Sequence, residues 1–145
     1  MFGEMALEGG SFSKYMILDL RMPSSADYNE DLEWVCKCFG FLESRDKEKT
    51  AAKVFKALLE AMKDRKGLSS DELAKKTGLT RGTMVHHLNN LIQSGLVVHR
   101  EGWYELRGMS LQRTVQEIKR DISRVFENIE HIAKGIDETL GLIYR

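Results

Sequence analysis

The fold is decided by residues 68–106, LSSDELAKKTGLTRGTMVHHLNNLIQSGLVVHREGWYEL. Ser69 and Glu72 have the spacing of a capping box at the start of a short helix, and Gly78 is a stop signal at its end. Only two residues separate this stop from the start of a longer helix, which Thr80 can cap. Two helices joined by such a tight corner predict a helix-turn-helix motif.

The flanking elements extend this motif. Residues 46–67 are rich in Ala, Leu, Lys and Glu, and their apolar residues have helical spacing, so they predict a helix that Gly67 closes. After the longer helix, two β-prone runs surround Glu101 and Gly102, which predicts a hairpin with a tight turn. Helix, capped helix, third helix and hairpin in this order predict a winged helix-turn-helix. Its third helix enters the major groove, and its hairpin, the wing, lies on the flanking DNA.

The same residues resemble a known family. They are similar to the DNA-binding core of ArsR-like winged-helix transcription regulators, archaeal relatives included, over roughly residues 50–107. The resemblance implies the fold, DNA binding, a homodimer and a palindromic operator. The shared pattern is carried by Glu72-Leu73-Ala74, Thr77-Gly78-Leu79-Thr80, Thr83-Met84, His87-Leu88, Leu91 and Gly95-Leu96-Val97.

The third helix, predicted over residues 80–94, has one apolar and one polar face. At about 100° per residue, Met84, Leu88 and Leu91 form the stripe that is expected to be buried. On the opposite side, Asn and Gln side chains can read adenine, and free N–H groups at the helix start favour phosphates. The predicted DNA-contacting residues are Thr80, Arg81, Gly82, Thr83, Val85, His86, Asn89, Asn90 and Gln93 on this helix and His99, Arg100 and Arg107 on the hairpin, which spans residues 96–107.

Two adjacent histidines in this helix suggest a metal site, but their spacing argues against one. Neighbouring helical residues diverge by about 100°, whereas metal-binding pairs on a helix are four positions apart. We therefore predict that His86 belongs to the DNA-facing side and that His87 is a partly buried packing residue beside Met84 and Leu88.

The C-terminal third, residues 109–145, carries a heptad repeat. Its apolar residues follow one another in alternating steps of four and three, and such a stripe on an otherwise polar helix needs a partner helix. We expect a homodimer; packing of this helix on its own winged domain is the alternative. The predicted dimerisation residues are Leu111, Val115, Ile118, Ile122, Val125, Ile129, Ile132 and Ile136.

Residues 1–45 form an N-terminal extension of open function, either a dimer arm or a ligand-responsive lid. Residues 14–23 alternate with a period of two and predict a strand that ends at Pro23. The following segment predicts a short helix capped by Asp27 or Ser25 and stopped by Gly40.

Cys36 and Cys38 are weak candidates for a metal or redox site. Some ArsR-like sensors use a Cys-x-Cys pair, but theirs lies in the helix that leads into the reading helix. The corresponding segment here, residues 69–76, has no cysteine. On a helix, two residues at this spacing also point to different sides, so one thiol is expected in the core.

Composition narrows the class of protein. The net charge of zero is uneven: residues 1–45 carry −4, residues 46–109 carry +4 and residues 110–145 carry 0, so the middle segment suits a polyanion. We find no signal peptide, membrane span, nucleophile–base pair, phosphate loop or strong metal motif. These observations predict a cytoplasmic protein that is not an enzyme and needs no cofactor, with no evident small-molecule ligand.

The sequence thus predicts a mostly α (α+β) protein with an N-terminal strand-helix extension (1–45), a winged helix-turn-helix domain (46–108) and a C-terminal dimerisation helix (109–145). It predicts a sequence-specific regulator that binds double-stranded DNA as a homodimer. The alternatives are a protein–protein interaction module on the same fold and a thiol or metal sensor that uses Cys36 and Cys38. The operator, the regulated genes, the direction of regulation and the inducing signal stay open.

Overall fold

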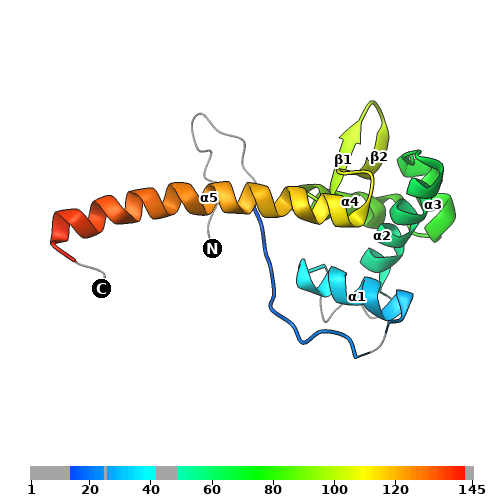
Figure 1. The fold of residues 1–145 in the computed structure, drawn as a ribbon. Coiled ribbons are helices and arrows are strands. Elements are labelled where there is room, and N and C mark those ends of the chain that lie inside the picture. Colours follow the sequence, from blue (N-terminus) through cyan, green and yellow to red (C-terminus); the bar gives the residue numbers. More distant parts are fainter. Residues whose placement is uncertain (1–13, 25, 42–48, 143–145) are drawn as a thin grey trace.

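A computed structural model describes residues 14–24, 26–41 and 49–142. A helical body carries a two-stranded hairpin, and a long helix leaves this body as a straight rod (Figure 1). The winged-helix order predicted from the sequence is confirmed. The elements are α1 (Tyr28–Cys38), α2 (Thr50–Ala61), the 3₁₀ turn η1 (Met62–Asp64), α3 (Ser70–Thr77), α4 (Arg81–Gln93), β1 (Val97–Arg100), β2 (Trp103–Leu106) and α5 (Leu111–Leu140).

Local signals fix the corner between α3 and α4. The Ser69 hydroxyl accepts a hydrogen bond from the Glu72 amide and caps α3. Gly78 ends α3 with φ of +71°, in the left-handed region that favours glycine. The Thr80 hydroxyl then accepts from the Thr83 amide and caps α4. Each of these roles is confirmed as predicted.

The hairpin is antiparallel, and Val97 pairs with Leu106 and Arg100 with Trp103. Both turn residues, Glu101 and Gly102, have positive φ, which is the conformation that a two-residue hairpin turn requires. Because one strand face packs inward, Val97 and Leu106 are buried in the core. The wing is therefore anchored at its base and free at its tip.

The core lies where α2, α3, α4 and the base of the hairpin meet. The apolar stripe of α4 is buried as predicted, with Met84, Leu88 and Leu91 almost fully covered. Phe55 and Leu58 of α2 and Leu73 of α3 pack in the same cluster. The opposite side of α4 is left for another role.

The N-terminal extension differs from its prediction. Residues 14–23 form no strand, because no strand among the described residues lies beside them. Two hydrogen bonds instead tie the segment to α1, from the Leu18 amide to the Cys38 carbonyl (2.8 Å) and from the Trp34 indole to the Arg21 carbonyl (2.9 Å). The helix after them is confirmed, with the Asp27 carboxylate accepting from the Glu30 amide as its cap and Gly40 beyond its end. Ser25, the other predicted cap, lies outside the described residues.

The helix predicted over residues 46–67 also ends earlier than expected. Residues 46–48 lie outside the described part of the chain, and α2 runs only to Ala61 before one 3₁₀ turn. Arg65, with φ of +50°, makes the reversal in place of Gly67. Gly67 has a different role, because a Cβ there would lie 2.9 Å from the Tyr104 carbonyl oxygen. It lets the chain pass close to β2.

The long helix α5 is continuous over its 30 residues. The Ser110 hydroxyl caps its start by accepting from the Arg113 amide, and Gly141 ends it with φ of +71°. Among the described residues, no helix is both long and apolar enough to cross a bilayer. The predicted heptad helix is thus present, and its two halves have different surroundings.

Candidate nucleic-acid interface

The side of α4 that faces away from the core carries most of the predicted DNA-contacting residues. Arg81, Gly82 and Thr80 lie exposed at its N-terminal end, where unpaired N–H groups favour an anion. Asn89 and Gln93 are exposed further along the helix, and Val85 is 42% exposed. Since α4 contains no Asp or Glu, nothing on this helix repels a phosphate backbone.

Gly82 has no packing reason to be glycine. A Cβ at this position would meet no atom within 4 Å, and the residue sits inside a helix, where glycine is less favourable than alanine. Open space above an exposed helical backbone is what a closely approaching duplex would need. The geometry thus agrees with the role that the sequence predicts for this residue.

The two histidines of α4 have different neighbours. His87 is half-buried, and its Nε2 lies 2.7 Å from the Thr50 hydroxyl of α2, so its predicted packing role is confirmed. His86 is exposed, and its Nε2 lies 3.4 Å from the amide nitrogen of Asn90, one helical turn away. Both rings line a shallow hollow with Lys14 and Phe41 of the N-terminal extension. That edge of α4 therefore borders the extension.

The hairpin has two different faces. On one, the His99 and Tyr104 rings stack in parallel, 4.1 Å between centroids. On the other, Arg100 is exposed and reaches Glu105 across the strands at 3.7 Å, a distance at which an exposed pair contributes little. Of the three predicted wing contacts, His99 and Arg100 are thus exposed at the wing.

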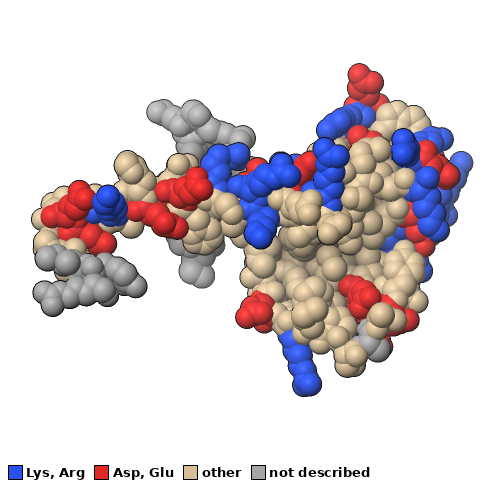
Figure 2. All heavy atoms as spheres, in the orientation of Figure 1, with Lys and Arg blue, Asp and Glu red and all other residues tan. Residues whose placement is uncertain are grey.

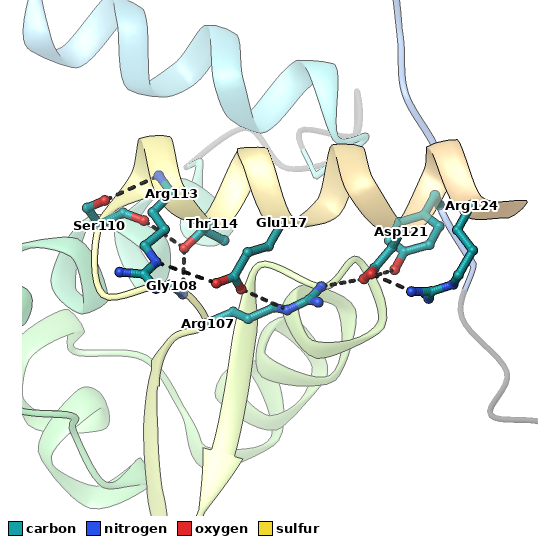
Figure 3. Close-up of polar contacts among 9 residues, drawn as sticks. Arg107, Gly108, Ser110, Arg113, Thr114, Glu117, Asp121 and Arg124 are labelled. Carbon is teal, nitrogen blue, oxygen red and sulfur yellow. Dashed lines mark hydrogen bonds and ion pairs between the residues drawn. The ribbon is translucent and has the colours of Figure 1, made fainter. Parts of the chain in front are cut away.

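Arg107, the third, has another role (Figure 3). Its guanidinium lies 2.6 Å from the Asp121 carboxylate and 3.2 Å from that of Glu117, both on α5. Asp121 also accepts a hydrogen bond from Tyr15, and the hydrogen bond from Arg107 lowers the pKa of its carboxyl below the usual value. Two acidic side chains thus hold Arg107 as a strut between hairpin and rod, and its predicted DNA contact stays a prediction.

Sequence reasoning missed two basic residues at the wing. The loop of Arg65 and Lys66 runs beside β2, because Leu68 and Tyr104 exchange both backbone hydrogen bonds (2.8 and 2.9 Å). The ammonium of Lys66 lies 5.6 Å from the centre of the exposed Trp103 ring. The sequence predicts these two residues as the end of a helix. Their position beside the wing depends on the pairing of Leu68 with Tyr104, which is distant in the sequence.

Basic side chains gather on the part of the body that carries α3 and the hairpin (Figure 2). This agrees with the +4 balance of residues 46–109. Lys53, Lys56 and Lys76 line a second shallow hollow between α2 and α3. The surface around the motif therefore carries the charge that phosphate contacts need.

The two cysteines of α1 differ in exposure, Cys36 being buried and Cys38 partly exposed. Cys36 is fully buried, and burial, followed by the nearby charge of Glu33, raises the pKa of its thiol to about 12. Burial and Asp19 also raise the pKa of Cys38. Both raised pKa values favour the protonated thiol over the reactive thiolate. No cluster of three metal-ligating side chains occurs in the described part of the chain.

Comparison with known families agrees with this geometry. Residues 48–100 match the family model described as a helix-turn-helix domain. These residues are thus similar to that family. The match covers α2, α3, α4 and β1, less than half of the chain, and it supports a DNA-binding helix-turn-helix regulator. Comparisons with curated proteins and with solved structures give no significant match.

Proposed function

We propose that this protein is a sequence-specific transcriptional regulator that binds double-stranded DNA as a homodimer. Helix α4 lies in the major groove, and the hairpin lies on the flank. One observation carries the proposal: α4 presents an exposed, acid-free face of Asn, Gln, His and Gly beside a basic wing. Such a face suits base edges, because Asn and Gln side chains can pair with adenine and no acidic side chain on the helix repels the phosphates.

The roles divide by chemistry. Asn89 and Gln93 can make paired hydrogen bonds to adenine, and Val85 can contact a thymine methyl group. Arg81 and Arg100 bind phosphates and supply affinity that falls with salt. Arg65 and Lys66 extend the wing contact, because the bridge at Leu68 holds their loop against the hairpin. The ArsR-like resemblance belongs to the same proposal.

The homodimer is supported by α5. Large apolar side chains stand exposed along its outer half, where they would be covered in a dimer. Two copies of α4 would then contact half-sites about 34 Å apart, one turn of the duplex. The exposed residues are Val125, Phe126, Ile129, Ile132, Ile136 and Leu140.

Selection of bound DNA from a random pool, followed by gel shift, tests the function. With the selected site, Asn89→Ala should cost about 1–3 kcal/mol at one base pair and relax the preference there. Arg100→Ala should weaken all sequences alike and reduce the salt dependence. Asn29→Ala, the same truncation on exposed α1, is the matched control and should bind as the parent does.

The outcomes separate the candidate functions. Specific, salt-sensitive retention that responds to Asn89 and Arg100 supports a DNA-binding regulator. If no DNA is enriched, or neither variant alters binding, α4 does not read DNA and the competing proposal, a protein–protein interaction module on the same fold, is favoured.

A further inference from the structure

An apolar groove of about 580 Å³ lies beside the first half of α5. One wall is the segment with Ile17 and Leu18, the floor includes Trp34 and Val35 of α1, and α5 forms the other wall. Several of these side chains are large and exposed, Ile17 to 54%. The groove continues onto the heptad stripe, because Val115, Ile118 and Ile122 belong to both.

The second half of α5 is wider in its apolar face than a two-helix seam needs. The heptad positions Val125, Ile129, Ile132 and Ile136 are all exposed, 64% for Ile132. Phe126, Ala133 and Leu140, spaced by seven, add a third apolar column along one edge of the stripe. A face with three apolar positions per heptad packs against two surfaces rather than one helix.

We propose that the second half of α5 from a second copy fills this groove, with the two α5 helices antiparallel and each copy filling the groove of the other. The inference rests on the homodimer of the proposed function. It gives the N-terminal extension, whose role the sequence left open, a part in the dimer interface. The extension and α1 form a wall that receives the third apolar column.

The edges of α5 favour the antiparallel order. A two-fold axis perpendicular to a helix pair brings the same edge of both helices together. The groove opens on the edge of α5 that carries Lys119, and Phe126 and Leu140 lie on that same edge because they follow at multiples of seven. In a parallel pair, the groove would face the opposite edge, with Asp121 in place of an apolar column.

The charges of the two halves also favour this order. Residues 111–124 carry four basic and two acidic side chains, a balance of +2, whereas residues 125–140 carry one lysine and four acids, a balance of −3. Figure 2 shows the blue side chains where the rod leaves the body and mostly red ones toward its far end. An antiparallel pair places the basic half of one α5 beside the acidic half of the other, whereas a parallel pair places halves of the same charge together.

The proposed register covers the apolar stripe of both helices. With the axis between Val125 and Phe126, Val115 lies opposite the partner's Ile136, and Ile122 lies opposite the partner's Ile129. Lys119 then lies between the partner's Glu130 and the partner's Asp137 along one edge. Every apolar level of the groove thus receives an apolar residue.

Spin-label distances measured without DNA test the order of the helices. A label on Arg113→Cys should give pairs separated by about 38 Å along the axis, and one on Glu127→Cys by about 5 Å, at about 1.5 Å per residue. Both are made in a Cys38→Ser background, with Cys36 fully buried. Equal distances at the two positions mean a parallel pair and overturn the proposal, while the dimer and its DNA binding stand.

A matched pair of charge substitutions tests the groove itself. Ile17→Asp places a carboxylate in the groove wall and should raise the dimer dissociation constant at least about tenfold. Met22→Asp makes the same change at a residue that is 74% exposed and outside the groove, and should leave the constant unchanged. Both sites are already solvent-exposed, so neither variant threatens the fold.

The remaining outcomes are decisive as well. Equal dimerisation of the two variants would mean that the groove is not part of the interface. A chain that stays monomeric in sedimentation overturns both the proposal and the dimer. A small apolar molecule retained in native mass spectra would mean that the groove has another occupant, which overturns the proposal and leaves the dimer standing. Gel shift on the selected DNA is independent of this result, so a failed dimer and a failed DNA-binding function are told apart.

Discussion

The two halves of α5 carry one heptad repeat but have different surroundings. In the first half, Ile118 is 2% exposed and packs in the core of its own domain, and Thr114 is fully buried. In the second half, every apolar position of the repeat is exposed. The repeat therefore shows that an apolar stripe must be covered, but not which surface covers it. The first half is partly covered by its own chain, with Val115 still 38% exposed, whereas the apolar positions of the second half have no cover within the described chain.

The first half also receives the strut from the hairpin. Glu117 and Asp121 bind Arg107, and Thr114 accepts a hydrogen bond from the Gly108 amide at 2.9 Å (Figure 3). These contacts fix the rod to the base of the wing. If the α5 helices of a dimer set the distance between the two winged domains, these contacts hold each α4 at a fixed position relative to its own α5.

The largest contrast should appear in the stability of the monomer. Ile118→Ala removes buried methyl groups and leaves a cavity, which should lower the free energy of unfolding by about 2–5 kcal/mol. Ile132→Ala, the same change at an exposed position two heptads later, should change it by less than about 0.5 kcal/mol. Urea unfolding at a concentration where the chain is monomeric measures both.

The same two variants can also contradict the division of α5 into two halves. Equal costs for the two variants in the monomer would show that the outer half of α5 packs on its own chain. The division of the helix into an inner and an outer half would then be wrong.

Charge reversal on the outer half should have the next largest effect. In the antiparallel dimer, Glu130→Lys with Asp137→Lys places two lysines beside the partner's Lys119 and should raise the dissociation constant about tenfold. In a parallel dimer the same change relieves repulsion between acidic halves, so the constant should fall. Sedimentation equilibrium at low salt gives the sign, and the effect should shrink as salt is added.

The winged domain could be predicted because its signals are local. Ser69 and Thr80 cap helices that begin one residue later, and Gly78 ends a helix at its own position. The exposed side of α4 followed from the periodicity of Met84, Leu88 and Leu91. All of these depend on residues within a few positions of one another.

Features that depend on distant partners could not be predicted. The alternation of residues 14–23 suits a strand, but a strand needs a neighbour, and none occurs beside this segment in the part of the chain that the structure describes. Arg107 looked like a free wing cation because its partner Asp121 lies on another element. Ile118 looked like a seam residue for the same reason, since periodicity shows a stripe and not the surface that meets it.

The smallest effect concerns the joint between wing and rod, and it depends on pH. Hydrogen bonding to Arg107 lowers the pKa of Asp121 below its ordinary value of 3.8, so the charged carboxylate stabilises the fold above that value. Asp121→Asn should therefore cost about 0.5–1 kcal/mol near neutral pH, as expected for a partly exposed network. The difference from the parent should vanish as pH falls through the lowered pKa, because the parent's carboxyl is then protonated too.

Asp137→Asn, on the exposed outer half, is the control and should show little difference at any pH in the monomer. Urea unfolding from about pH 7 to about pH 3 measures both; a loss for Asp121→Asn that persists unchanged at the acid end would mean that packing, and not charge, holds the joint.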